Sequence, residues 1–490
     1  MEMVRRIDAL LGERMAEARV EPAPRSSDAE FLRRASLDLN GVIPRVADVR
    51  AFLADQSPDK RQKLVDRLLA SPHHATHLAN SWRQLMLPPG LGLQQIQNVA
   101  GVQNWLRGQF SQNMRYDRVV NEFLVSSGGG EAGPALYYTS LELKPEKLAA
   151  STSRIFLGLQ IECAQCHPHP FDHWKQENFW GYAAFFAQLD QTQAMSPGGR
   201  VSLVDLPDGE VTLPDTETVV APKYLDGTDL ADRQRGTRRQ QLAIWMASRD
   251  NPFLARAAVN RVWSHMFGRG LVEPVDDLGP HNPPSHPQLM KELTDYFVEA
   301  GFDLRDLYRT LGLTDAYQRT SVQQSDETPP AELFATMAIK TMTSEQLYDC
   351  LKQTLMRSSG DGPAFLPGAR GLFDPQRLAF AAKMNMQGSN ATEFEAGVLQ
   401  ALTMLNGSET AAATSVVQSS LLSSLEAPWF TDEDRVDVLL LATLSRLPSD
   451  EERRAFSAHV DSAADQEKKQ HAFSDILWAL LNSAEFMMNH

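Results

Sequence analysis

The sequence predicts a mainly α-helical protein in which two helical domains are joined by a short β-hairpin or ribbon segment. Apolar residues recur at helical spacing along most of the chain. Capping-box and Ser-Pro patterns mark several helix starts. Residues 195–229 instead alternate apolar with polar side chains. We therefore expect a first helical domain at 1–190, a β-rich connection at 191–237 and a second helical domain at 238–490.

The first domain is expected to consist of helices joined by short loops. Ser27 and Glu30 have capping-box spacing, and the helix that they open is expected to run toward Gly41. The Ser-Pro pairs at 57–58 and 71–72 each place a cap residue before a proline at the first helical position. Further helical patterns occur at 102–110, 116–124, 146–162 and 177–189. The third of these is expected to end next to Cys163.

The connection and the second domain have different patterns. Val201 and Leu203 alternate with polar residues before the turn sequence at 207–209, and Val211 and Leu213 do so after it, which predicts a small hairpin. Helical patterns then resume at 242–247, 257–267, 287–300, 344–355 and 473–488.

Charge and hydropathy argue against several partners. The chain has 47 basic and 62 acidic residues, so its formal net charge is −15. Nucleic acids and anionic membranes are held by clustered Lys and Arg, so neither is an expected partner. No stretch approaches the roughly 20 apolar residues of a membrane span. The start of the chain has no apolar signal region, so we expect a cytoplasmic protein or a mature form that has lost its leader.

The most informative motif is Cys-x-x-Cys-His at Cys163, Cys166 and His167, the attachment signature of c-type haem. Two thiols three residues apart at a helix end reach the two vinyl groups on one edge of the porphyrin. The adjacent histidine then supplies the proximal nitrogen to the iron. This interpretation makes Cys163 and Cys166 the thioether anchors of a covalent haem c, with His167 as its proximal ligand.

Three other interpretations of the same stretch stay open. Cys163, Cys166, His169 and His173 have the spacing of four ligands in a tetrahedral zinc site. The two cysteines alone would suit a redox dithiol or a disulfide, although the βαβ context of a thioredoxin-like motif is missing. A five-residue pattern with two free positions also arises by chance in a chain of this length.

Several long stretches, in a fixed order, resemble one known family. In the first domain they are Phe31–Gly41, Lys60–Pro72 and Phe156–Phe171. In the second domain they are Asn251–Phe253, Val259–Gly279, Leu399–Asn406 and Leu477–Phe486. Together they resemble the exported proteins, abundant in planctomycetes, that join a cytochrome-c-like PSCyt domain to a PSD domain, both of unknown function.

The resemblance implies an extracytoplasmic, periplasmic-type bacterial protein with a presumed haem. The family's characteristic segment is Cys-x-x-Cys-His-x-His-Pro-Phe, which extends the candidate cofactor site to His169, Pro170 and Phe171. His173 lies outside that pattern, which weakens the zinc interpretation. Because the family is exported and no leader opens this chain, we expect a mature or trimmed form.

Other polar residues have weaker assignments. His169 is too close to His167 to reach the opposite haem face, and we expect it to shape the loop through a hydrogen bond. His73, His74 and His77 are expected to form a surface cluster at a helix start. One of these three histidines is also a candidate for the sixth haem ligand, as are Met86, His265, His281 and His286. An ion-pair network that fixes the turn after Gly270 is expected from Arg261, His265, Arg269, Glu273, Asp276 and Asp277.

The sequence therefore favours a monohaem c-type protein with a redox or electron-transfer role and a redox partner protein. One alternative is a non-catalytic structural or binding protein whose cysteine loop holds zinc or a disulfide. A second alternative is a polysaccharide-active enzyme that uses the second domain, although the sequence offers no obvious catalytic pair for it. A visible haem absorption band separates the first hypothesis from the other two.

Overall fold

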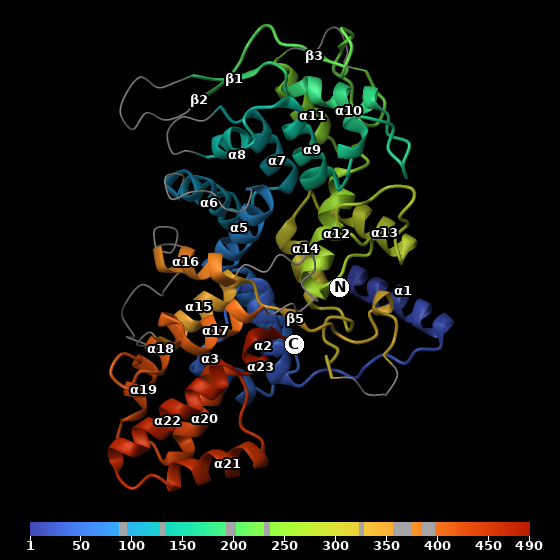
Figure 1. The fold of residues 1–490 in the computed structure, drawn as a ribbon. Coiled ribbons are helices and arrows are strands. Elements are labelled where there is room, and N and C mark those ends of the chain that lie inside the picture. Colours follow the sequence, from blue (N-terminus) through green and yellow to red (C-terminus); the bar gives the residue numbers. More distant parts are fainter. Residues whose placement is uncertain are drawn as a thin grey trace. The chain divides into compact units, whose positions relative to one another are not determined.

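Helices dominate the structure, a computed structural model, and the predicted mainly α fold is confirmed (Figure 1). The structure describes residues 1–87, 96–127, 133–192, 202–229, 236–322, 328–355, 375–384 and 397–490. Within these ranges every strand belongs to a small two-stranded antiparallel pair. Among the helices in the described ranges, we find none with the length and apolar character needed to cross a bilayer.

The chain forms two compact units, and neither is a continuous stretch of sequence. Unit 1 consists of Met1–Leu10 and Leu78–Leu311, and unit 2 consists of Leu11–His77 and Gly312–His490. The division falls within α1 (Glu2–Ala18) and α5 (Pro72–Met86), and before the last residue of α14 (Leu304–Gly312). The domain boundaries predicted at residues 190 and 238 divide the sequence into consecutive segments, and they stay a prediction.

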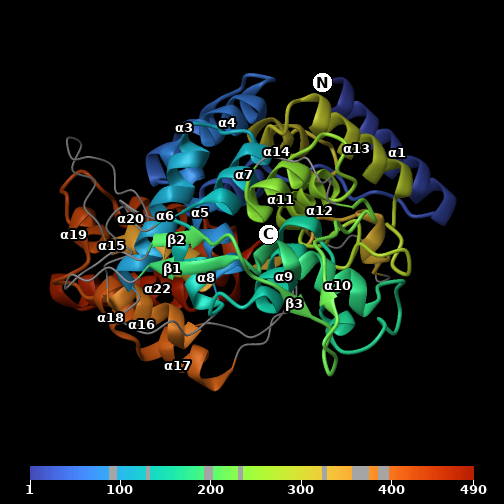
Figure 2. The same ribbon diagram turned by 90° about the horizontal axis from the view of Figure 1, so that it is seen from above.

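Unit 1 is built mainly from helices of moderate length. Its helices are α6 (Ile96–Ser111), α7 (Tyr116–Val125), α8 (Ala135–Ser140), α9 (Pro145–Thr152), α10 (Gln176–Ala183), α11 (Arg238–Met246), α12 (Leu254–Phe267), α13 (Pro287–Glu299) and α14 (Leu304–Gly312). Helices α7 and α11 lie side by side, as do α9 and α10, in both ribbon views (Figures 1 and 2).

An aromatic core holds these helices together. The Phe123 ring of α7 lies 4.9 Å from Tyr137 of α8 and 5.3 Å from Phe156, measured between ring centroids. Such edge-to-face pairs add to the area that the rings bury. The aromatic stretch predicted as one helix at 177–189 forms α10 followed by a 3₁₀ turn, Ala184–Phe186, and Tyr182 is fully buried within it.

The predicted hairpin across residues 207–209 is wrong in its pairing, although strands do form there. The structure pairs β1 (Leu189–Thr192) with β2 (Ser202–Asp205), and β3 (Val211–Thr212) with β4 (Val219–Val220). The backbone N–H of Leu206 donates to the carbonyl of Gln188, which extends the first pair up to the turn. Each predicted strand, β2 and β3, therefore pairs with a strand other than the one expected across the turn. Val201 lies outside the described residues.

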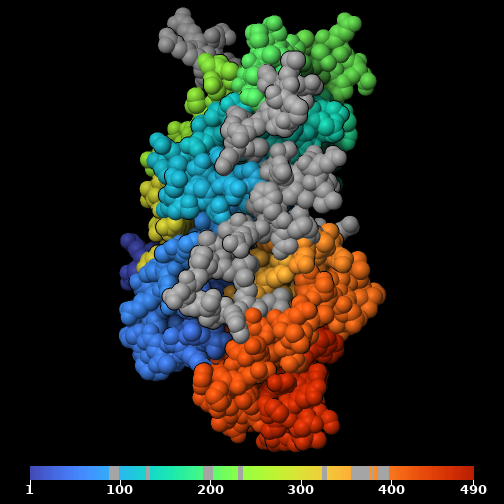
Figure 3. Space-filling view, turned by 90° about the vertical axis from the view of Figure 1, so that its left-hand side faces the viewer, coloured from blue at the N-terminus to red at the C-terminus, as the bar shows by residue number. Residues whose placement is uncertain are grey.

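Unit 2 contains the remaining helices. They are α2 (Asp28–Asn40), α3 (Val46–Ala54), α4 (Lys60–Leu69), α15 (Ser344–Leu355), α16 (Pro375–Met384), α17 (Val398–Asn406), α18 (Ser408–Thr414), α19 (Ser420–Leu425), α20 (Asp432–Thr443), α21 (Asp450–Asp461), α22 (Gln466–Leu481) and α23 (Ala484–Met487). One short pair joins β5 (Lys340–Thr341) to β6 (Met488–Asn489). Figure 3 shows α18 to α22, in orange to red, as one closely packed group.

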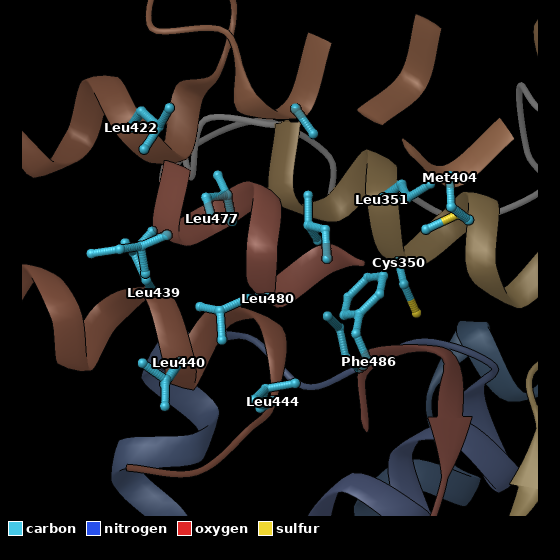
Figure 4. Close-up of a cluster of buried hydrophobic side chains, with 14 of the residues drawn as sticks. Cys350, Leu351, Met404, Leu422, Leu439, Leu440, Leu444, Leu477, Leu480 and Phe486 are labelled. Atoms are coloured by element: carbon cyan, nitrogen blue, oxygen red, sulfur yellow. The ribbon is translucent and has the colours of Figure 1, made fainter. Parts of the chain in front are cut away.

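The core of unit 2 is a cluster of buried apolar side chains. Figure 4 shows members of this cluster that come from α15, α17, α19, α20, α22 and α23. The predicted helix start at α2 is confirmed, because the Ser27 hydroxyl accepts from the backbone N–H of Glu30. The Glu30 carboxylate instead binds Arg34 and Thr320, so only this half of the predicted capping box forms. The single helix predicted at 473–488 is wrong: α22 ends at Leu481, and Ser483 caps the separate helix α23.

Two buried arginines connect α2 to the rest of unit 2. The fully buried Arg33 guanidinium donates to the carbonyls of Thr443 at 2.8 Å and Phe486 at 2.9 Å. Arg34 donates to the carbonyls of Tyr317 and Arg319, both at 2.8 Å. Burial lowers the pKa of Arg33 to about 10, which leaves the guanidinium charged at neutral pH. These bonds satisfy carbonyls that would otherwise be buried without partners.

Candidate functional site

The chain approaches the Cys-x-x-Cys-His motif through a helix that stops early. Helix α9 continues as a π-helical turn, Ser153–Leu157, and ends at Gly158 with a left-handed φ of 66°. The helix predicted to reach Cys163 is therefore interrupted. A Cβ at Gly158 would lie 2.5 Å from Leu278 Cδ1, so only glycine allows both the backbone turn and this close approach.

The motif itself begins on a 3₁₀ turn, Glu162–Gln165, which carries Cys163, and Cys166 follows as its C-cap. A 3₁₀ helix has three residues per turn, so residues three apart share one face. Ala164 is fully buried, whereas both cysteines are exposed and neither is in a disulfide. The turn and its C-cap therefore leave both thiols exposed to solvent within one short stretch of chain.

His167 follows the second thiol and is also exposed. Its Nδ1 lies 2.8 Å from the carbonyl of Pro168. Because a carbonyl only accepts, Nδ1 carries the hydrogen, and the lone pair of the neutral ring is on Nε2. A histidine whose one N–H is held by a backbone carbonyl has the arrangement common among metal-ligating histidines.

The rest of the loop is shaped by His169. Its backbone N–H donates to the carbonyl of Trp174 at 2.8 Å, and its Nδ1 accepts from the N–H of Phe171 at 3.3 Å. The hydrogen bond expected of this residue is therefore present. Pro170 is exposed, and the Phe171 side chain is 76% exposed. The loop thus places a large apolar surface next to the exposed thiols.

The fourth residue of the zinc interpretation, His173, has other partners. Its Nδ1 and its backbone N–H both donate to Asp172 Oδ1, at 2.5 and 2.6 Å. Its ring lies 4.1 Å from the Trp174 ring. Within the ranges that the structure describes, no three His, Cys, Asp or Glu side chains are grouped so that they could hold one metal ion. The zinc interpretation of Cys163, Cys166, His169 and His173 stays a prediction.

A second stretch of chain, residues 273–286, contacts the C-terminal end of the loop. His281 Nε2 donates to Asp277 Oδ2 at 3.1 Å, and His281 Nδ1 lies 3.6 Å from Asp172 Oδ2. The rings of His281 and His169 are 6.3 Å apart. The Asp172 side chain is only 4% exposed. Sequence reasoning assigned no role to Asp172, because a single aspartate in a loop belongs to no recognised pattern.

The same stretch also contacts the N-terminal end of the loop. The N–H of Leu278 donates to the carbonyl of Gly158 at 2.9 Å. Asp276 accepts from Gln160 Nε2 at 2.8 Å. Arg154 pairs with Glu162 at 2.7 Å and lies 3.5 Å from Asp276. Burial raises the pKa of the Glu162 carboxyl above its ordinary value, and Arg154 opposes that effect.

The structure separates the charged residues that crowd the sequence at 261–277. Glu273 does fix the turn, because its carboxylate accepts from the Gly270 N–H at 2.9 Å. Arg261, however, donates to backbone carbonyls at 154 and 155, and His265 bonds to Tyr308 at 2.8 Å. The expected single network is therefore wrong, since its members have different partners.

The other histidine candidates lie in different surroundings. His286 bonds to its neighbour Ser285, whereas His281 meets the loop through Asp172. The predicted surface cluster near residue 73 is wrong: His74 and His77 are buried, and His74 Nδ1 lies 2.7 Å from the Leu39 carbonyl. Burial also lowers the pKa of His73 to about 4.

Two family models match the chain in succession. The PSCyt2 model, described as a protein of unknown function (DUF1549), matches residues 6–191. The PSD1 model, also described as a protein of unknown function (DUF1553), matches residues 238–370. No curated protein matches the chain, and no solved structure does.

These matches place the two halves of the site in different families. The Cys-x-x-Cys-His loop lies within the PSCyt2 match, and residues 273–286 lie within the PSD1 match, although both belong to unit 1. The order of the matches is the one that the sequence predicts. The chain therefore joins a PSCyt2 segment to a PSD1 segment, two families of unknown function.

Proposed function

We propose that this protein is an extracytoplasmic monohaem c-type protein with a redox or electron-transfer role. The observation that carries the proposal is the exposure of Cys163 and Cys166 on one short turn and its C-cap, with the exposed His167 directly after them. Thioether attachment needs two thiols that approach one porphyrin edge together, and this turn offers them. A bound haem c would supply an iron that accepts and donates one electron.

The residues around the thiols fit such a group. His167 has its Nδ1 hydrogen on the Pro168 carbonyl, which leaves Nε2 as the nitrogen for the iron. Phe171 offers an exposed apolar ring beside the anchors, and a flat apolar cofactor would cover it. His169 holds the loop in shape through its bonds to Phe171 and Trp174. The exposed loop also suits brief contact with a redox partner protein.

The test uses the full chain, made in a host with export and haem-maturation machinery. We expect a Soret band, and an intact mass that includes one haem and survives denaturation. The double variant with Cys163→Ser and Cys166→Ser should lose both signals, whereas Cys350→Ala should keep them, because Cys350 is buried in unit 2. A colourless wild-type protein of apo mass would overturn the proposal, whether metal analysis then found zinc or none.

Coordination of the iron defines the redox role more closely. Addition of cyanide or imidazole to the haem protein should shift the Soret band if one axial position is open, as catalysis on a bound substrate requires. An unchanged spectrum would indicate a six-coordinate electron carrier. His167→Ala should shift or weaken the Soret band while the thioethers still hold the haem, and an unaltered spectrum in this variant would contradict the assigned proximal ligand.

A further inference from the structure

We call residues 158–174, which carry the Cys-x-x-Cys-His motif, the Cys loop. Asp172 of this loop lies beside His281, and His281 also binds Asp277. We call these three residues, together with the adjacent Gly279, the Asp172–His281 cluster. Asp172 comes from the loop, and the other three come from the PSD1 segment. The two ring nitrogens of His281 face two different carboxylates. The cluster therefore joins the two families by electrostatic contacts inside one compact unit.

The contacts fix the orientation of the His281 ring. A carboxylate only accepts, so the 3.1 Å bond from Nε2 to Asp277 places a hydrogen on Nε2. The ring then directs Nδ1 toward Asp172, whose side chain is 4% exposed. A carboxylate so withdrawn from water needs hydrogen-bonding or charged partners: His173 donates to its Oδ1, and the His281 ring lies 3.6 Å from its Oδ2, where it forms an ion pair when both ring nitrogens carry hydrogens.

Gly279 makes this arrangement sterically feasible. A Cβ on Gly279 would lie 2.5 Å from His281 Nδ1 and 2.6 Å from Asp172 Oδ2. Any larger residue would push the loop and the PSD1 segment apart. The close approach of Asp172 and His281 thus depends on the missing side chain between them.

The PSD1 segment contacts both ends of the loop. At the N-terminal end it binds Gly158 through Leu278 and Gln160 through Asp276. At the C-terminal end it meets Asp172 through His281. The nine residues from Cys163 to Phe171, which carry the exposed thiols, lie between these two attachments.

We propose that Asp172 and His281 are positioning residues, through which the PSD1 segment holds the Cys loop in the shape that keeps its two thiols on one face. Both families then contribute to a single site. The consequence for haem attachment rests on the proposed function, but the effect on the loop and on its thiols does not.

Hydrogen exchange of the full-length, haem-free chain tests the attachment. Asp172→Asn and His281→Gln should each speed exchange in peptides covering 159–175 by about tenfold, because the loop opens more often. The double variant should add little to either single change, since both remove one interaction. The matched control is His459→Gln, which breaks an exposed histidine–aspartate pair at 3.4 Å in unit 2 and should leave these peptides unchanged. Unchanged exchange in both cluster variants would overturn the proposal.

The thiol pair provides a readout that reports on the geometry of the site. In a 3₁₀ turn the Cα atoms of Cys163 and Cys166 are roughly 6 Å apart, within reach of a disulfide. Equilibration of the haem-free chain with reduced and oxidised dithiothreitol measures how readily they pair. A loosened loop lowers the effective concentration of one thiol near the other. The equilibrium constant for disulfide formation should therefore fall about threefold in Asp172→Asn and in His281→Gln. A constant equal to that of the wild type would contradict a positioning role.

Gly279→Ala provides a variant that keeps every charge. Its Cβ should separate His281 from Asp172 and reproduce the effects of the charge variants on exchange and on the thiol constant. It also keeps the test decisive if one charge variant fails to fold. Because these measurements use haem-free protein, a colourless wild type would overturn only the proposed function, whereas unaltered exchange and thiol pairing would overturn only this inference.

Discussion

The ammonium group of Lys340 lies 2.6 Å from Asp38 Oδ1, and both side chains are almost completely buried. Asp38 also accepts from the Tyr317 hydroxyl at 2.7 Å and from the Asn489 amide at 2.6 Å. Burial lowers the pKa of Lys340, while Asp38 opposes that effect. The Asp38 carboxylate thus accepts from three side-chain donors, one of which is the buried Lys340 ammonium.

Asp38→Asn should destabilise unit 2 strongly, because it removes the carboxylate that lies 2.6 Å from the buried Lys340 ammonium. The expected cost is about 3–5 kcal/mol, the usual effect of removing one partner of a buried pair. Urea unfolding followed by circular dichroism measures it. Asp59→Asn breaks an exposed pair with Lys63 and should leave the urea midpoint unchanged. Equal midpoints for the two variants would contradict the role of Asp38.

Stability toward acid should depend on Glu452. Arg446 binds its carboxylate with two bonds of 2.7 Å and lowers the pKa of Glu452 to about 2. Above the ordinary glutamate pKa this contribution is fully present. As the pH falls from about 4.5 toward 2, the unfolded chain takes up a proton before the folded one does, so stability decreases. Urea midpoints between pH 5 and 3 should therefore fall less steeply in Glu452→Gln, and identical slopes would refute the assignment.

The three cysteines should differ sharply in reactivity. Cys163 and Cys166 are exposed, whereas Cys350 is fully buried and burial raises its pKa to about 12. The thiolate is the reactive form, so Cys350 should resist alkylation in the folded protein. Treatment of haem-free protein with iodoacetamide should modify two sites under native conditions and the third only after denaturation. Early modification of Cys350, seen by peptide mass analysis, would contradict the buried position.

Gly158→Ala should weaken the helix end before the Cys turn. A left-handed alanine costs about 1–2 kcal/mol, and its Cβ would also meet Leu278. Thermal unfolding should show a lower midpoint for this variant. Gly108→Ala is the matched control in α6, since its Cβ would meet nothing within 4 Å and alanine favours a helix. A control that destabilised as much as Gly158→Ala would show that the left-handed backbone is not the cause.

Local patterns predicted much of the fold. The capping box at Ser449 forms, and at Ser27 the N-cap hydrogen bond forms, because each depends on two residues three apart. The pairing of strands near residue 208 could not be predicted in this way, since each strand found a partner beyond the expected turn. Burial of His74 and His77 was missed for the same reason, because packing against distant chain decides it.

The candidate site likewise combines residues that a local motif predicts with residues that only the fold brings together. The motif identified Cys163, Cys166 and His167 from spacing alone. The neighbouring contact between Asp172 and His281 depends on a fold that brings two distant stretches together. His281 was one of several candidates for the sixth haem ligand, and no pattern in the sequence distinguished it from the others. Contacts across long sequence separations carry no local signal, so only the structure could show them.

The interleaved order of the two units has a consequence for synthesis on the ribosome. The first part of unit 2, Leu11–His77, emerges early, but its partners begin at Gly312, and β6 is added only with Met488–Asn489. At ordinary elongation rates the early helices wait roughly 20 to 80 s for the end of the chain. Unit 1 is complete well before that. The nascent protein thus exposes the apolar faces of α2 to α4 for most of its translation, which makes them natural binding sites for a chaperone.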